Sequence, residues 1–252
     1  MTFVDAVYCI WLRNLKRYLR SKSRIVGSLG MPILFFVMLG FGLDAVIKLP
    51  GMDGSYLSFI VPGITAMSVL FTALFAGIQV IWDKQFGFLK ETLVAPVSRV
   101  ALMLGQTLGG ATTALIQGII ILVIALLLTG ALPTIQGALI AFVFVVIIGI
   151  AFTAMGIAFA SRMKDMQGFQ LIMNFVIFPI FGLSGAIFPL NAIPEWLRFV
   201  AYLDPLTYGV EGLRYGLLGT SFIDPLISFV VITAFALAMI LIGAYFFQKT
   251  KL

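Results

Sequence analysis

The charged residues of the stretch 83–99 interrupt two long apolar blocks of the sequence. The stretch reads Asp-Lys-Gln-Phe-Gly-Phe-Leu-Lys-Glu-Thr-Leu-Val-Ala-Pro-Val-Ser-Arg. Phe86, Leu89 and Leu93 recur at helical spacing, which predicts a short amphipathic helix. Pro96 would end this helix, because its ring cannot continue the hydrogen-bond ladder. Such an element suits contact with a soluble partner, although a polar connector at the lipid headgroups fits the pattern equally well.

The remaining side chains offer little for catalysis. Histidine is absent, Cys9 is the only cysteine, and the few carboxylates stand at the ends of apolar blocks. The commonest general base and metal ligand are therefore missing, and no internal disulfide can form. We predict neither a catalytic nor a metal site. The dipeptide Gly-Lys does not occur, so the chain has no Gly-x-x-x-x-Gly-Lys-Ser/Thr loop for a nucleotide phosphate.

The composition belongs to a membrane protein. The chain of 252 residues is 62% hydrophobic and only 10% charged, whereas soluble domains carry about 25% charged residues. This predicts an all-α polytopic membrane protein that forms a single domain over 1–252. In that class a net charge of +6 marks the cytoplasmic side rather than a nucleic-acid-binding surface.

The uncharged stretches are long enough for six membrane-spanning helices. A span needs about 20 residues across a hydrocarbon core of about 30 Å. The stretch 100–161 holds two spans, because Gly130 and Pro133 mark a turn within it. We predict spans near 25–43, 57–82, 100–129, 135–160, 167–188 and 224–247.

The basic residues predict the orientation of these spans. With the N-terminus in the cytoplasm, six spans return the C-terminus there as well, and 13 of the 16 basic residues fall inside. This distribution follows the positive-inside rule. The three basic residues left outside are Lys48, Arg198 and Arg214.

The N-terminal stretch 1–24 predicts an amphipathic helix lying in the headgroup layer. Apolar residues from Val4 to Tyr18 follow one face, and basic residues follow another. Anchoring to lipid explains this pattern, and contact with a cytoplasmic partner is compatible with it. The residues that define this elbow helix are Trp11, Arg13, Arg17 and Arg20.

Polar and small residues within the spans predict helix packing. Gly105 and Gly109 form a Gly-x-x-x-Gly pattern, which allows close approach between helices of this chain. Gln170 and Asn174 stand before Pro179 in the fifth span. Because an amide facing lipid is costly, we expect these amides to face a neighbouring helix or a cavity.

The stretch 188–214 differs from the spans in kind. It is apolar, yet prolines and charged residues interrupt it too often for a membrane crossing. Two short helices that dip into the outer leaflet fit this pattern, as a re-entrant hairpin. The residues on which the hairpin depends are Pro189, Pro194, Glu195, Trp196, Pro205, Glu211 and Arg214.

Several motifs together resemble the permease subunits of type-2 ABC exporters, the superfamily that exports drugs, lipids and polysaccharides. Four of them occur in order: Leu-Ser-Gly-Ala-Ile-Phe-Pro at 183–189, Pro-Glu-Trp at 194–196, Asp-Pro-Leu-Thr-Tyr at 204–208 and Glu-Gly-Leu-Arg at 211–214. The segments 81–87, 93–96 and 98–99 look like the family's cytoplasmic loop. Gln85 departs from the glutamate often found there, which puts a salt bridge at that position in doubt.

The resemblance implies a transport subunit rather than an enzyme. Two permeases, expected to be identical, would pair above two ATPase subunits, which carry ATP and Mg²⁺. The coupling contacts would come from the stretch 83–99, at Asp83, Lys84, Gln85, Gly87, Leu89, Glu91, Pro96 and Arg99. The first and fifth spans would line the path of the cargo, at Phe35, Phe36, Gln170, Asn174, Phe178 and Phe181.

Other functions remain open at this stage. A secondary transporter would show titratable residues in mid-membrane or inverted repeats, and neither is visible. A membrane enzyme would need clustered Asp, His or Cys. Within the family, the cargo could be amphipathic, lipid-like or a drug, and a polysaccharide or glycolipid is the alternative. The compact chain and the absence of a targeting segment favour a prokaryotic inner membrane.

Overall fold

The computed structural model describes residues 2–44, 55–87, 97–130, 132–163 and 165–249. These residues form helices and connecting turns, with no strand among them. Six helical units are long and apolar enough to cross a membrane, which confirms the predicted number. They are Ile25–Asp44, Tyr56–Gln85, Arg99–Thr129, Ile135–Arg162, Met166–Leu183 and Pro225–Gln248.

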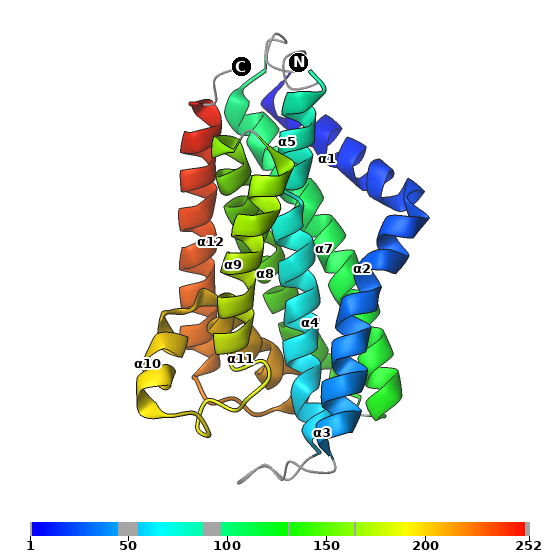
Figure 1. Cartoon of the computed structure of the whole chain (residues 1–252), viewed down its shortest axis with the longest axis vertical. Coiled ribbons are helices and arrows are strands. Elements are labelled where there is room, and N and C mark those ends of the chain that lie inside the picture. Colours follow the sequence, from blue (N-terminus) through cyan, green and yellow to red (C-terminus); the bar gives the residue numbers. More distant parts are fainter. Residues whose placement is uncertain (1, 45–54, 88–96, 131, 164, 250–252) are drawn as a thin grey trace.

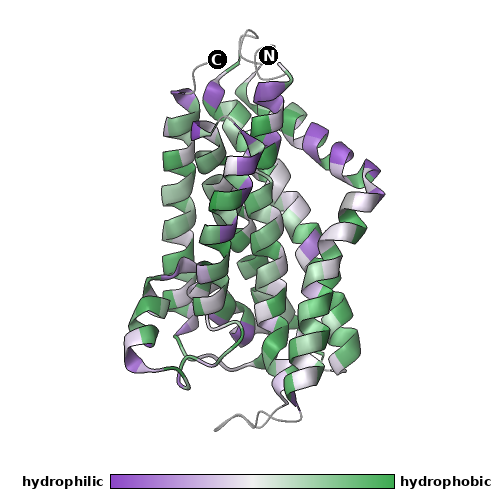
Figure 2. Cartoon of the chain, viewed as in Figure 1, coloured by the Kyte–Doolittle hydropathy of each residue, from purple (hydrophilic) through white to green (hydrophobic). Residues whose placement is uncertain are grey.

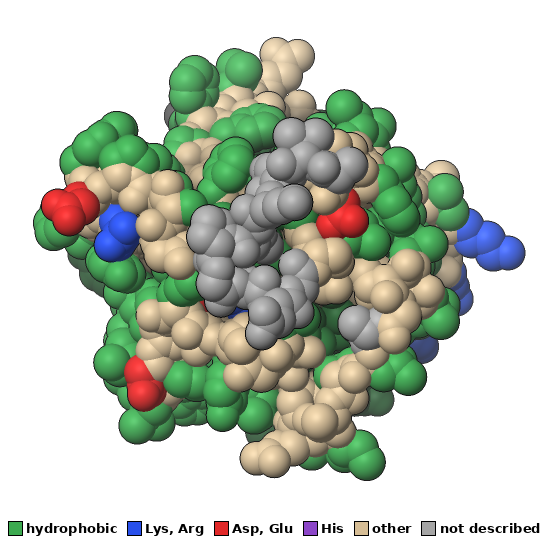
Figure 3. Space-filling view, turned by 90° about the horizontal axis from the view of Figure 1, so that it is seen from below, with side chains coloured by type: hydrophobic (Ala, Val, Ile, Leu, Met, Phe, Trp, Pro, Cys, Tyr) green, Lys and Arg blue, Asp and Glu red, His purple; other side chains and the backbone are tan. Residues whose placement is uncertain are grey.

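The long helices run roughly parallel to the long axis of the molecule, whereas α1 runs obliquely to it (Figure 1). Both termini lie at one end, and α10 and α11 lie at the other. Hydrophilic residues gather towards the end with the termini and along α1, whereas the long helices are mainly hydrophobic (Figure 2). Seen from the opposite end, hydrophobic side chains dominate and charged ones are few, with several basic ones along one edge (Figure 3).

The N-terminal helix is shorter than predicted. α1 (Phe3–Arg20) starts at a capping box, in which the Thr2 side chain and the Asp5 side chain bond each other's backbone N–H groups. It ends at Ser21, and α2 (Lys22–Phe35) leaves in a new direction. The stretch 1–24 is therefore not one helix, because its last basic residues already belong to α2.

The first span continues from α2 through a π-helical segment, η1 (Phe36–Phe41), into α3 (Gly42–Asp44). The second span consists of α4 (Tyr56–Phe75) and α5 (Ile78–Gln85), with a break at Gly77. A Cβ at Gly77 would lie 2.4 Å from the Gly156 carbonyl oxygen of α8. The break thus lies where two backbones touch.

The third and fourth spans are α7 (Arg99–Thr129) and α8 (Ile135–Arg162). Gly130 ends α7 with a φ of 67°, a conformation that glycine adopts without strain, and Thr134 caps α8. The predicted turn between these spans is confirmed. α4 is the most enclosed span, with 78% of its apolar window buried, and it packs against both α7 and α8.

The fifth span, α9 (Met166–Leu183), continues through Pro179 and ends five residues before the predicted end at 188. A turn at Gly185, with φ 72°, follows it. Two short helices come next, α10 (Glu195–Leu203) and α11 (Pro205–Leu218), and then the last span, α12 (Pro225–Gln248). The prediction of two short helices in this part of the chain is confirmed, and how they lie in a membrane stays a prediction.

Candidate functional site

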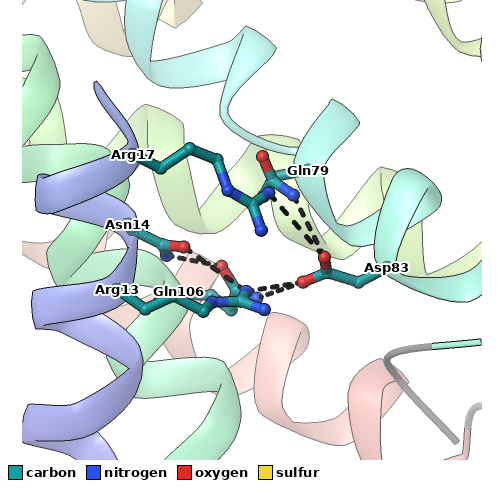
Figure 4. Close-up of polar contacts among 6 residues, drawn as sticks. All are labelled: Arg13, Asn14, Arg17, Gln79, Asp83 and Gln106. Atoms are coloured by element: carbon teal, nitrogen blue, oxygen red, sulfur yellow. Dashed lines mark hydrogen bonds and ion pairs between the residues drawn. The ribbon is translucent and has the colours of Figure 1, made fainter. Parts of the chain in front are cut away.

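A buried carboxylate joins three helices at the end of the molecule that holds the termini. Asp83 lies in the last turn of α5 and is only 4% exposed. Nη2 of Arg13, from α1, donates to Oδ2 of Asp83 at 2.6 Å (Figure 4). Nη1 of Arg17 lies 3.9 Å from the other oxygen, Oδ1. Two cations of α1 therefore face one carboxylate of the second span.

Three amides complete this cluster. Nε2 of Gln79, one helical turn before Asp83, donates to Oδ1 at 3.1 Å. Nε2 of Gln106, from α7, donates to Oδ2 at 3.1 Å, and Oε1 of Gln106 accepts from Nδ2 of Asn14 at 2.6 Å. The shared carboxylate thus links α1, α5 and α7 through charge-assisted hydrogen bonds. We call these six residues the Asp83 cluster: Arg13, Asn14, Arg17, Gln79, Asp83 and Gln106.

Glycines of α7 allow α1 to approach closely enough for these contacts. A Cβ at Gly105 would lie 2.8 Å from Cβ of Ile10, and one at Gly109 would lie 2.7 Å from Cβ of Asn14. The Gly-x-x-x-Gly pattern therefore serves packing within the chain, as predicted. Further along the same contact, Nε1 of Trp11 donates to Oγ1 of Thr112 at 3.0 Å.

Lys84 ties the same turn of α5 to a fourth helix. Its Nζ donates to the backbone oxygens of Ala160 at 3.0 Å and Ser161 at 2.8 Å, at the carboxyl end of α8. A cation there satisfies carbonyls that have no partner within their own helix. α5 is thereby fixed to α8 immediately beside the Asp83 cluster.

The helix of the second span extends further into the polar stretch 83–99 than the sequence indicated. Asp83, Lys84 and Gln85 belong to α5, so the helix predicted to start at Asp83 does not begin there. α5 ends at Gln85, and Gly87 has a φ of 78°. The predicted coupling residues Leu89, Glu91 and Pro96 lie outside the described residues, as does Leu93. At the far side of the interruption, Arg99 begins α7, and its Nη1 donates to the Gln248 backbone oxygen at 2.6 Å.

The basic residues of α1 do not share one environment. Arg13 points inward to Asp83, whereas Arg20 is exposed. Arg13 therefore pairs with a buried carboxylate of α5, and the location of α1 at the headgroups stays a prediction. On the predicted apolar side, Tyr18 is buried and its hydroxyl donates to Oε1 of Gln117 at 2.8 Å, but Val4 is exposed.

The opposite end of the molecule contains a different ion pair. Glu211 and Arg214 of α11 are fully buried and bonded to each other, as residues three positions apart on one helix face can be. Nη2 of Arg214 donates to the Gly185 backbone oxygen at 2.8 Å, and its guanidinium lies 4.3 Å from the centre of the Phe59 ring. Oε2 of Glu211 accepts from the Phe222 backbone N–H at 2.6 Å. We call this group the Arg214 pair.

Other predicted hairpin residues begin the short helices. Pro194 precedes the first residue of α10, Glu195, and Pro205 is the first residue of α11. Oδ1 of Asp204 caps α11 by accepting from the Leu206 N–H at 3.0 Å, and burial raises the pKa of Asp204 to about 8. Among the other predicted hairpin residues, Trp196 is 70% exposed and Pro189 is buried.

The predicted path residues separate into two groups. Gln170, Asn174 and Phe178 recur every fourth residue on one exposed face of α9. Phe36 and Phe181 are each 3% exposed and pack inside the chain, with Phe35 against Phe181 at 6.3 Å between ring centres. The buried pair lines no exposed surface in this structure, and the role of all six in a path stays a prediction.

Asn14, Gln79 and Gln106 of the Asp83 cluster were not predicted as site residues. A signal for one of them existed, because Gln79 and Asp83 stand four apart at the end of an otherwise apolar span. The contacts with α1 join residues 70 and 92 positions apart, and the contact between Asp83 and Gln106 joins residues 23 positions apart, which spacing alone does not reveal. Among the described residues no group of His, Cys, Asp or Glu could hold a metal ion.

Comparison with known proteins identifies the family to which this chain belongs. The profile of the family described as ABC-2 type transporter matches residues 5–218. The inner membrane transport permease YadH of Escherichia coli K12 is 27% identical over 253 residues, covering 98% of this chain and 96% of its own length. A protein named as the doxorubicin resistance ABC transporter permease DrrC, from Mycobacterium tuberculosis, is 28% identical over 231 residues, covering 88% and 80%. A protein named as the transport permease ycf38, from Porphyra purpurea, is 30% identical over 200 residues, covering 78% and 68%.

Proposed function

The chain belongs to the ABC-2 type transporter family, and we propose that it is the membrane-spanning subunit of an exporter driven by a separate ATPase. Its relatives are transport permeases rather than enzymes. The sequence has no Gly-Lys dipeptide and hence no phosphate loop of the Gly-x-x-x-x-Gly-Lys type. ATP and Mg²⁺ therefore belong to a partner polypeptide in this proposal.

The proposed assembly contains two copies of this chain and two ATPase subunits. The ATPases dock at the end that holds both termini, against the stretch 83–99 and α1. The presence of both termini at the same end supports the even number of crossings that this arrangement needs. The excess of basic residues there supports a cytoplasmic location, in a prokaryotic inner membrane.

The Asp83 cluster is the observation that carries the proposed coupling. A push on the residues after Gly87 would act on α5, because only Phe86 and Gly87 separate them from the end of α5 at Gln85. Asp83 would then move α1 through its hydrogen bond with Arg13, at 2.6 Å, and α7 through its hydrogen bond with Gln106, at 3.1 Å. Coupling of this kind requires a physically connected network, and the cluster supplies one.

We propose that α1 is the elbow helix at the headgroups and that α10 and α11 form the re-entrant hairpin in the outer leaflet. Exposed Trp196 and the apolar character of α10 support the second assignment. The face of α9 that carries Gln170, Asn174 and Phe178 is a candidate for the wall of the path. Residues that line a path between two copies must be exposed in the single chain, as these three are.

The proposed cargo is amphipathic, either lipid-like or a drug. The name of the relative DrrC concerns doxorubicin resistance, which supports a drug. A direct assay is uptake of a fluorescent anthracycline into inverted vesicles that contain the permease and its ATPase. Uptake that needs ATP supports the drug cargo, and ATP-dependent flipping of a labelled lipid without anthracycline uptake would assign a lipid instead.

The first test of the proposal is co-purification with a candidate ATPase. We expect the pure permease to hydrolyse no ATP and the complex to do so. Gly87→Pro and Glu91→Arg should weaken complex formation or stimulated hydrolysis, while Glu195→Arg, the same charge change at the opposite end, should not. Hydrolysis by the pure permease, or no partner at all, would overturn the two-subunit proposal.

A further inference from the structure

Two surface cavities share a lining residue of α1, and one of them lies at the corner between α1 and α2. One has a volume of about 790 Å³ and is lined by residues from Arg13 to Ser23. The other has a volume of about 740 Å³ and lies between α1 and the second span. Arg17 lines both, so its side chain stands between the basic cavity and the cavity beside the second span. Figure 4 shows this side chain reaching from α1 towards α5.

The first cavity is strongly basic. Its described lining holds five cationic side chains and no carboxylate; these cations are Arg13, Lys16, Arg17, Arg20 and Lys22. Lys16, Arg20 and Lys22 are exposed, and the neighbouring hydroxyls of Ser21 and Ser23 add polar groups. A phosphate group is the ligand that such a set of donors complements best.

The second cavity is mainly apolar. Its wall is formed by Phe75, Ile78, Trp82 and Phe86, and the rings of Trp82 and Phe86 lie 5.2 Å apart. Trp82 is 45% and Phe86 73% exposed, so both offer their faces to a ligand. The wall follows the second span from its polar end towards mid-membrane, which is the direction an acyl chain takes below its headgroup.

The single carboxylate in the second cavity does not oppose an anionic ligand. Asp83 is only 4% exposed, and Arg13 and two amides already surround its oxygens. The described linings of the two cavities together hold five cations and one carboxylate, Asp83. Their net charge is therefore positive.

We infer that this corner binds one anionic phospholipid of the adjacent leaflet. The headgroup phosphate lies among Arg17, Arg20 and Lys22, and an acyl chain lies along Trp82 and Phe86. A soluble polyanion would match the basic cavity but leave the aromatic wall bare. The inference concerns a resident lipid and does not depend on which cargo the chain exports.

Quenching of Trp82 by brominated lipid tests this site. The permease is reconstituted in vesicles of phosphatidylcholine with a small fraction of brominated phosphatidylglycerol, or with the same fraction of brominated phosphatidylcholine. The signal of Trp82 is the difference between the natural chain and Trp82→Phe, since Trp11 and Trp196 are unchanged. We expect saturable quenching by the anionic lipid at fractions where the zwitterionic lipid quenches little.

Two matched variants decide whether the basic corner causes this preference. Arg20→Gln with Lys22→Gln should lower the preference for the anionic lipid roughly ten- to thirty-fold. Arg162→Gln with Lys249→Gln removes the same charge from the same end but outside the cavities, and should leave the preference unchanged. Equal quenching by both lipids, or equal losses in both double variants, would overturn the inference.

Discussion

The Asp83 cluster and the Arg214 pair stand at opposite ends of the described structure and are built differently. The Asp83 cluster joins three helices, and two arginines of α1 face its carboxylate at 2.6 and 3.9 Å. The Arg214 pair lies within one helix, and both of its side chains are fully buried. The first arrangement can exchange partners when helices shift, whereas the second holds each charge to fixed groups.

This difference assigns different tasks to the two ends. Arg13 is 20% and Arg17 45% exposed, so water can replace a lost contact. Arg214 instead bonds the turn after α9, at Gly185, and lies over Phe59 of α4. We therefore interpret the Arg214 pair as a rigid contact that stabilises the end of the molecule with α10 and α11. We interpret the Asp83 cluster as the region where the movement of the helices starts.

The largest expected effect comes from breaking the Arg214 pair. Arg214→Met leaves the Glu211 carboxylate buried without its cation, and removal of one partner of a buried pair costs about 3–5 kcal/mol. Thermal unfolding in detergent should show a large loss of stability or no folded protein. Glu211→Met with Arg214→Met should recover part of it, and a double variant as unstable as the single one would contradict this reading.

The second prediction concerns the close packing near the same end. Gly137→Ala would place a Cβ 2.1 Å from the Gly216 carbonyl oxygen, where two backbones meet. We expect a loss of about 3 kcal/mol of stability, because a backbone cannot move aside as a side chain can. Gly30→Ala, which has no atom within 4 Å of the added Cβ, is the control and should unfold like the natural chain.

Arg13→Gln at the Asp83 cluster should have a smaller effect, of about 2 kcal/mol. Gln79 and Gln106 still donate to the carboxylate, and Arg17 is already near it. The measurement is again thermal unfolding of the purified chain. A loss as large as that of Arg214→Met would show that this cluster is as rigidly held as the pair at the other end.

A further prediction at the opposite end is a dependence of stability on pH. Burial raises the pKa of Asp204 from 3.8 to about 8, so the folded chain keeps a proton that the unfolded chain loses. Stability from this group is complete below pH ~4 and is lost as pH rises towards 8, with a fall in Tm of ~2–4 °C per kcal/mol.

Asp204→Asn is the matched variant for that titration. Asparagine is as good a helix cap as aspartate, so α11 should still begin correctly. The Tm of the variant should change less between pH 5 and about 8 than the Tm of the natural chain. Equal slopes would mean that Asp204 is already ionised in the folded protein.

The features that local sequence predicts are those that the structure confirms. Apolar length predicts six spans, Gly130 and Pro133 predict the turn between two of them, and Asp204-Pro205 predicts the start of α11. Each depends on a few neighbouring residues and on backbone chemistry. The Glu211 and Arg214 contact is also local, because residues three apart lie on one helix face.

The features that sequence reasoning missed depend on contacts between distant segments. Nothing near Arg13 indicates that Asp83, 70 positions later, would turn it inward. The break at Ser21 and the π-helical segment Phe36–Phe41 were likewise not predicted; the π-helical segment packs on α4, where a Cβ at Gly40 would lie 2.7 Å from Leu57. The predicted start of a new helix at Asp83 was wrong because the preceding span continues to Gln85, and the rest of that predicted helix lies outside the described residues.

The central claim is that the Asp83 cluster transmits force between the ATPase and the spans. The most direct measurement is cargo-stimulated ATP hydrolysis by the reconstituted complex, for the natural chain, Arg13→Gln, Asp83→Asn and the double variant. We predict that each single variant assembles but loses stimulation, and that the double variant loses no more than either single one. Full stimulation in both single variants, or additive losses in the double variant, would contradict the claim.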